Sequence, residues 1–282
     1  MTAYQILQKK LLQKETGSKK AAPESGGKGS LIMKVLLNAI DMLAAVVKSL
    51  RPLNDAELKR LREEFVIEAT YNSNAIEGNT LTLRETALIL QEGITIAAKP
   101  LRDHLDVIGY RDAFYYILDL AKEDTPLTES VIKNIHSLVL MNDAENKGRY
   151  RSVPVRIMGA EHTPPQPYLV PVAMEHLIEN YATWQKEQHI LEAIARMHLE
   201  FESIHPFIDG NGRTGRLLLE LELVKHGLLP IDIKFHDRSA YYDCFDAYRN
   251  SNGNPEAMTR LIATYEQLEL ERYIAIIRNK KE

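Results

Sequence analysis

A polar, glycine-rich loop between two amphipathic segments is the feature that most constrains the fold. Apolar residues recur at helical spacing from Ile190 to Ile204, so a helix should lead into the loop. Pro206 disfavours helical backbone at His205, and this helix should therefore end there. A second segment with helical spacing starts near Arg213 and reaches Gly227. The loop is thus expected to join the end of one helix to the start of the next.

The loop carries the residue types of a phosphate site. Gly210 and Gly212 flank Asn211 and permit backbone angles that side chains forbid. A glycine-rich loop that feeds a helix N-terminus leaves backbone N–H groups without partners, and the helix dipole adds positive potential, so a phosphate is the expected ligand. His205 is a candidate base, and Asp209 is a carboxylate able to hold a divalent cation. With the two arginines that follow on one helical face, these groups favour transfer from a nucleotide.

Context excludes two other phosphate motifs. Residues 210–215 satisfy G-x-G-x-x-G, but the dinucleotide fingerprint requires a preceding strand, and the preceding segment here has helical spacing. The same residues have the glycine spacing of a P-loop, but Arg216-Leu217 stands where that motif requires lysine followed by serine or threonine.

The twelve residues from His205 to Arg216 resemble the signature of the Fic family, H-P-F-x-D/E-G-N-G-R-x-x-R, at every defined position. The resemblance implies an all-α fold, a Fic-type helical bundle with a short β-hairpin flap over the active site. It also implies transfer of AMP from ATP to a Ser, Thr or Tyr hydroxyl of a protein, the chain itself included. Some members with lysine at the second motif glycine phosphorylate instead, so Gly212 favours AMP transfer.

The resemblance also implies roles for individual residues. His205 takes the proton from the attacking hydroxyl, Asp209 holds Mg²⁺ against the phosphates, and Phe207 is an apolar anchor. Tyr241 and Tyr242, whose helical spacing by itself indicates core residues, match a pair that borders the adenine pocket. The implied ATP-binding residues are Gly210, Asn211, Gly212, Arg213, Thr214, Gly215, Arg216, Tyr241, Tyr242 and Asn250.

A second motif lies where an earlier helix ends. Asn54 can cap a helix from Asp55 through Ile76, and a C-cap with Gly78 in the left-handed conformation is the simplest interpretation of its end. A carboxylate in the last turn opposes the helix dipole, which indicates a partner elsewhere for Glu77.

The run from Ser73 to Glu77-Gly78 resembles the inhibitory motif S/T-x-x-x-E-G/N of Fic proteins with an N-terminal inhibitory helix. The resemblance implies that Ser73 and Glu77 are regulatory. Glu77 is expected to pair with Arg216, so that ATP binds in an unproductive pose. A further expectation is that Glu77 also supports removal of AMP.

Between Tyr150 and Pro171 the pattern changes to alternation. Val153, Val155 and Ile157 alternate with other residues, and a Gly-Ala turn and prolines follow, which predicts a short β-hairpin; an irregular proline-rich loop is the alternative. The segment resembles the family's flap, which pairs with the target protein. The target-docking residues are then Val155, Arg156, Ile157, Met158 and Gly159.

Length and composition bound the remaining possibilities. With 282 residues the chain can form one large domain or two small ones, and a net charge of −4 gives no electrostatic basis for nucleic-acid binding. Cys244 is the only cysteine, so no intramolecular disulfide can form. The expected division is a flexible segment at 1–30, a helical region with the inhibitory helix at 31–125, and the catalytic core with C-terminal helices at 126–282.

The segment Leu31–Leu50 is apolar enough to need a membrane test. Lys34, Asn38, Asp41 and Lys48 form a single polar stripe, which favours a heavily packed helix in water over a membrane span. The sequence start also lacks the pattern of a secretory signal. We therefore expect a cytoplasmic protein without a membrane partner, and the apolar 31–50 and Leu101 regions could support a homodimer.

Two alternatives stay open at this level. The chain could be an autoinhibited nucleotide-binding module that sequesters a partner, or it could transfer another group, such as UMP or phosphocholine. A module that only binds would not need His205. His104 and His136 lie within helical apolar segments and are interpreted as structural or solvated histidines.

Overall fold

The computed structural model describes residues 27–50, 53–157 and 162–278, and these residues form helices, turns and loops without a β-strand. The all-α expectation is confirmed. The helices are α2 (Gly27–Ser49), α3 (Asp55–Ile76), α4 (Leu83–Glu92), α5 (Leu101–Lys122), α6 (Glu129–Val139), α7 (Val170–Glu187), α8 (Ile190–Ile204), α9 (Asn211–Lys225), α10 (Arg238–Asn250) and α11 (Glu256–Arg278), with 3-10 turns at Pro167–Leu169 and Phe235–Asp237. A helix expected at 4–14 lies outside the described residues.

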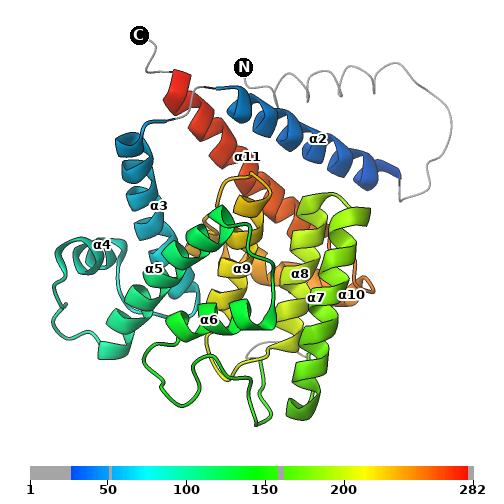
Figure 1. Ribbon diagram of the computed structural model, residues 1–282. Helices are drawn as coiled ribbons and strands as arrows, with labels where there is room; N and C mark the ends of the chain where they lie inside the picture. The colour runs from blue at the N-terminus through cyan, green and yellow to red at the C-terminus, as the bar shows by residue number, and fades with distance from the viewer. Residues whose placement is uncertain (1–26, 51–52, 158–161, 279–282) are drawn as a thin grey trace, which may run out of the picture.

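Helix α9 lies at the centre of the bundle, with α5 and α6 on one side and α8 on the other (Figure 1). Buried residues of α9 run from Asn211 to Leu223, so even its first turn is enclosed by protein. One continuous apolar core joins residues from α2 through α11, including Ile76, Tyr110 and Leu217. The expected division near residue 125 stays a prediction.

Local capping fixes the helix that carries the inhibitory motif. Asn54 and Glu57 form a reciprocal capping box at the start of α3, as its sequence indicates. Gly78 follows the end of α3 with φ +89°, the left-handed region expected of it. These two local signals place Ser73 and Glu77 at the C-terminal end of α3, beside α9.

Helix α2 departs from the expectation of heavy packing. It packs along α11 through Met33, Leu37 and Ile40, and only 17% of the window Ser30–Ser49 is buried. Leu31 and Met42 are exposed, because α2 lies at the edge of the bundle with a single helix beside it (Figure 1). Its length and mean hydropathy of 1.9 also fit a membrane span, so a protein without a membrane contact stays a prediction.

The expected hairpin is not formed by the described parts of its segment. Residues 153–157 and 162–166 contain no strand, and Met158 and Gly159 lie outside the described residues. Pro154, Pro164 and Pro165 lack the N–H that a β-ladder requires, so alternation alone overestimated the strand content here. The irregular proline-rich alternative describes these residues better.

Candidate active site

The side chain of Asn211 holds the loop before α9 in its conformation. Phe207 N–H donates to Asn211 Oδ1 and Asn211 Nδ2 donates to the Phe207 carbonyl, each at 2.9 Å. The ring of Phe207 is fully buried and stacks on His136 at 3.6 Å, so Phe207 is an apolar anchor as expected. Asn211 therefore supports the loop through its side chain, and only its backbone is left for a phosphate.

His136 completes this support. Its Nδ1 accepts from Gly148 N–H at 2.9 Å, so its Nε2–H donates to the Asp209 carbonyl, also at 2.9 Å. Burial lowers the pKa of His136 to about 4, which keeps the ring neutral in this role. The interpretation of His136 as structural is confirmed. His104 is structural as well, because its Nε2 accepts from Ile96 N–H at 2.9 Å.

The first turn of α9 offers backbone donors. Thr214 N–H is the first amide bonded into the helix, to the Gly210 carbonyl at 3.0 Å. The N–H groups of residues 211–213 precede it and have no acceptor within the helix. Gly210 adopts φ +75°, which turns the chain into α9. This is the anion-binding geometry expected from the sequence.

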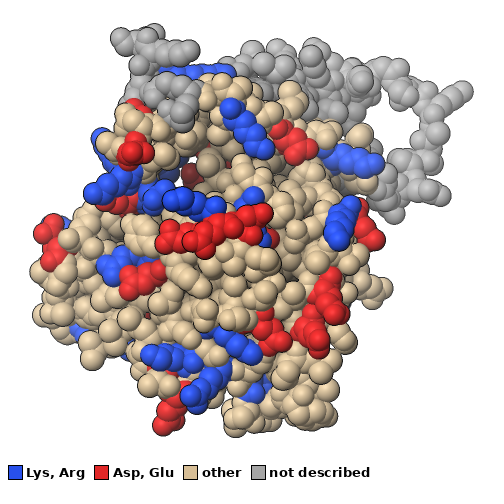
Figure 2. All heavy atoms as spheres, in the orientation of Figure 1, with Lys and Arg blue, Asp and Glu red and all other residues tan. Residues whose placement is uncertain are grey.

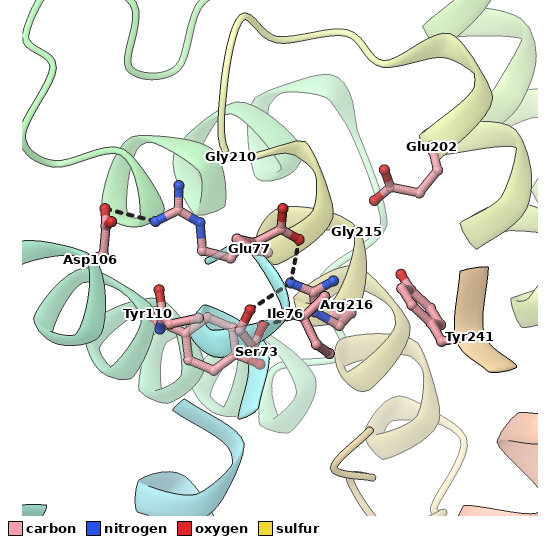
Figure 3. A network of polar contacts seen from close by, with 12 residues as sticks. Ser73, Ile76, Glu77, Asp106, Tyr110, Glu202, Gly210, Gly215, Arg216 and Tyr241 are labelled. Atoms are coloured by element: carbon pink, nitrogen blue, oxygen red, sulfur yellow. Dashed lines mark hydrogen bonds and ion pairs between the residues drawn. The ribbon is translucent and has the colours of Figure 1, made fainter. Parts of the chain in front are cut away.

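Arg216 is engaged by the end of α3 (Figure 3). Its Nη2 donates to Glu77 Oε1 at 2.8 Å and to the Ser73 carbonyl at 2.9 Å, and its Nε donates to Ser73 Oγ at 2.9 Å. The guanidinium is 4% exposed, whereas Glu77 is 36% exposed. Burial lowers the pKa of Arg216, but Glu77 together with Tyr241 and Tyr110 outweighs burial, so this pKa is raised. The pairing expected of Glu77 is present.

Gly212 makes room for that pairing. A Cβ at position 212 would lie 2.1 Å from Glu77 Oε1 and 3.2 Å from Arg216 Nη1. A side chain at position 212 would therefore displace the Glu77 carboxylate from its present place, and glycine avoids this.

Asp209 is bound by cations of the protein itself. Its Oδ2 is 2.5 Å from Arg102 Nη2, and its Oδ1 is 3.4 Å from Arg213 Nη2. Arg213, which is 2% exposed, also pairs with Asp106 at 2.7 Å. Sequence reasoning did not identify Arg102 and Asp106. Their spacing of four on α5 places them on one helix face, but nothing local shows that this face meets the loop.

A divalent cation can use Asp209 only together with phosphates. Within the described parts of the chain, no group of three His, Cys, Asp or Glu side chains could hold a metal ion. Mg²⁺ is commonly bound by one or two carboxylates plus substrate phosphates, and the lone carboxylate of Asp209 fits that arrangement. The residues present therefore fit a nucleotide-bound ion.

His205 ends α8 in the left-handed conformation, with φ +49°. Arg151 fixes it there, because Arg151 Nε donates to the His205 carbonyl at 2.8 Å and Arg151 N–H donates to the Pro206 carbonyl at 3.0 Å. The same guanidinium donates to the carbonyls of Val153 and Pro165, so it joins the flap segment to the loop. Sequence analysis did not single out Arg151.

A buried carboxyl group next to His205 was also missed. Glu202 lies three residues earlier on α8, with its Oε2 3.9 Å from His205 Nδ1. Burial raises the pKa of Glu202 to about 8, with a smaller contribution from Glu77. Its sequence signal is a glutamate between the apolar residues Phe201 and Ile204.

The two tyrosines after the motif occupy different positions. Tyr241 is buried and lies under Arg216, and its hydroxyl is 2.7 Å from His198 Nε2 (Figure 3). Tyr242 is 46% exposed, which leaves its ring free to stack on a base. Asn250 is exposed at the last position of α10, and no contact within the described residues joins it to the site, so its role stays a prediction. Thr214 and Gly215 are enclosed in α9.

Taken together, a loop–helix junction with a partly buried imidazole, a carboxylate and two arginines defines the class of site. Residues 126–223 match the model of the Fic/DOC family. This part of the chain is therefore a Fic domain.

Its relatives include proteins named protein adenylyltransferases. The chain is 32% identical to the protein adenylyltransferase Fic of Nematostella vectensis, over 79% of this chain and 52% of that protein. It is 29% identical to protein adenylyltransferase fic-1 of Caenorhabditis elegans, over 94% of this chain and 54% of that protein. The chain thus spans about half the length of the curated relatives it matches.

Solved structures agree on the fold. A Fic domain containing signaling protein from Bacteroides thetaiotaomicron superposes with a TM-score of 0.79 at 29% identity, covering 86% of this chain and 98% of that one. Fic-1 from C. elegans superposes with a TM-score of 0.76 at 28% identity, covering 89% of this chain and 74% of that one.

Proposed function

We propose that the chain is a protein adenylyltransferase that moves AMP from ATP to a Ser, Thr or Tyr hydroxyl of a protein, its own hydroxyls included. One observation carries the proposal. The junction of α8 and α9 brings a partly buried imidazole, a carboxylate and the first amides of α9 to one place. The names of the relatives, protein adenylyltransferases, support the same activity.

In this proposal His205 is the general base. Burial lowers the pKa of its imidazole, while the Glu202 carbonyl and the Glu77 carboxylate act in the opposite direction, so the ring is neutral at pH 7 and able to accept a proton. The target O–H bond breaks as its oxygen attacks the α-phosphorus, the proton moves to His205, and pyrophosphate leaves.

The phosphates are bound by α9. The amides of residues 211–213 and the side chains of Arg213 and Arg216 face the charge that develops on the leaving pyrophosphate. Asp209, released from Arg102, would hold Mg²⁺ against the α- and β-phosphates. The ion would supply charge neutralisation at those oxygens.

Glu77 makes the described state an inhibited one. The γ-phosphate of ATP and Glu77 compete for the same guanidinium, that of Arg216. Residues 155–159 would dock the target, and Arg151 would keep the described part of this segment next to His205.

The test is transfer of labelled α-phosphate. ATP labelled at the α-position is incubated with the chain and candidate targets, and the adduct is identified by mass spectrometry as AMP less water. His205→Ala is expected to bind ATP but to transfer nothing, because the base alone is removed. Labelling by His205→Ala equal to that by the parent protein would refute the proposal. Labelled UTP and CDP-choline serve as competing donors.

A further inference from the structure

The mechanism above leaves one buried acid next to the site unused. The side chain of Glu202 is 12% exposed, and its Oε1 is buried without a hydrogen-bond partner among the described residues. Burial of an unpaired carboxyl group is costly, so a sequence that retains one indicates a use for it.

The unused carboxyl group faces the catalytic ring. His205 Nδ1 is also buried, and although the Glu202 carbonyl lies near enough to raise the pKa of the ring, no hydrogen bond of normal geometry joins the two. Glu202 Oε2 is 3.9 Å from this atom, and the two residues share a face of the last turn of α8 and its cap. At this distance the two atoms do not form a hydrogen bond, so the pairing requires a rotation of one of the two side chains.

The neighbouring helix is shaped to admit this carboxyl group. A Cβ at Gly215 would lie 2.3 Å from Glu202 Oε1, so a larger residue at this position of α9 would force the Glu202 carboxyl group to move. Figure 3 shows the Glu202 carboxyl group extending from α8 toward Glu77 and Arg216. The carboxyl group of Glu202 is thus directed toward the ion pair of Glu77 and Arg216.

Charged and titratable groups surround Glu202 on several sides. Burial and Glu77 of α3 favour its neutral form, whereas Arg216 of α9 favours the carboxylate. Tyr241 of α10 stays protonated, because burial raises its pKa. His198 of the same helix stays neutral, because burial lowers its pKa to about 3. Tyr242 of α10 stays protonated, because burial raises its pKa.

We propose that Glu202 is a positioning residue for His205: its carboxyl group accepts a hydrogen bond from Nδ1–H and thereby leaves Nε2 free to take the proton of the target hydroxyl. This inference rests on the proposed adenylyl transfer. A ring whose Nδ1–H has an acceptor is fixed in one tautomer and one orientation, which is what a general base requires. As the proton arrives at Nε2, the ionised form of Glu202 also stabilises the imidazolium.

The experiment compares variants in the Glu77→Gly background, where Arg216 is free. Glu202→Gln keeps the size of the side chain but cannot ionise, and Glu200→Gln, on the same helix and bonded to Tyr248, is the matched control. Measurements are kcat and KM for ATP across pH, the affinity for a non-hydrolysable ATP analogue, and the titration of the His205 ring by NMR.

With Glu202→Gln, kcat is expected to fall by about tenfold or more while analogue affinity stays within about twofold, because only the base is affected. The pH profile loses its rise through the ionisation of Glu202, and the pKa of His205 falls in the NMR titration. The control variant changes neither quantity.

The idea is overturned if kcat and the His205 titration are both unchanged, since Glu202 then only fills space. Equal losses in kcat and analogue affinity also overturn it, because they indicate a general role in the pocket. If the Glu77→Gly protein transfers no AMP at all, the proposed function fails. The NMR titration still tests the pairing of Glu202 with His205 in that case, because it requires no turnover.

Discussion

Replacing Glu77 by glycine removes the carboxylate that holds Arg216. Disrupting a fully buried ion pair costs roughly 3–5 kcal/mol. Glu77 is 36% exposed, so solvent screens the pair, and a value of about 2–3 kcal/mol in favour of the closed state is appropriate. At that value about 1–3% of molecules are open, and freeing Arg216 raises activity by roughly 30- to 100-fold.

The assay is self-modification with ATP labelled at the α-phosphate, at equal protein concentration and below ATP saturation. Glu77→Gln is the matched variant: it keeps a hydrogen-bonding side chain without the charge and should fall between the two. Thermal unfolding of each variant shows whether the fold is kept. Equal labelling of the parent protein and Glu77→Gly would refute the inhibitory role of the ion pair.

Three further predictions concern other parts of the site. Arg102→Ala should lower the Mg²⁺ concentration needed for half-maximal labelling, because it removes a guanidinium 2.5 Å from Asp209; an unchanged Mg²⁺ titration would contradict this. Burial lowers the pKa of His136 to about 4 in the folded state, so on acidification the unfolded state takes up this proton before the folded state does. The stability that neutral His136 provides is therefore present above pH 6.5 and is lost as the pH falls toward 4. The free energy of unfolding lost in His136→Gln should thus shrink by about 2 kcal/mol between pH 6.5 and 5, as measured by urea unfolding, and a constant difference would count against it. Finally, AMP should be released from a pre-labelled target by the parent protein and not by Glu77→Gly; release by both would remove this role from Glu77.

Features specified by neighbouring residues could be predicted from the sequence. The start of α3 follows from Asn54 and Glu57, which satisfy each other's backbone donors within one turn. The end of α8 follows from Pro206, and the loop that follows it from the glycines around Asn211. Prediction of the Glu77–Arg216 pair needed the family resemblance as well. The helix dipole indicates only that a carboxylate at the end of α3 is unfavourable without a cation, and it does not say which cation.

Features specified by tertiary contacts could not be predicted. Arg102 meets Asp209 across 107 positions of sequence, and Arg151 meets His205 across 54, with no local pattern to mark either contact. Glu202 is a single polar residue between apolar ones, and only the packing of α9 against α8 shows what it faces. In the flap segment, alternation favoured strands, but the prolines withhold the hydrogen bonds that strands need.

The absence of a side chain at Gly212 matters both in the inhibited state and in the state proposed to bind ATP. Its Cα lies where the inhibitory carboxylate enters, and its backbone belongs to the turn that would receive ATP. An alanine at position 212 would displace Glu77 and would also weaken the binding of ATP. The first effect would raise turnover, and the second would lower it.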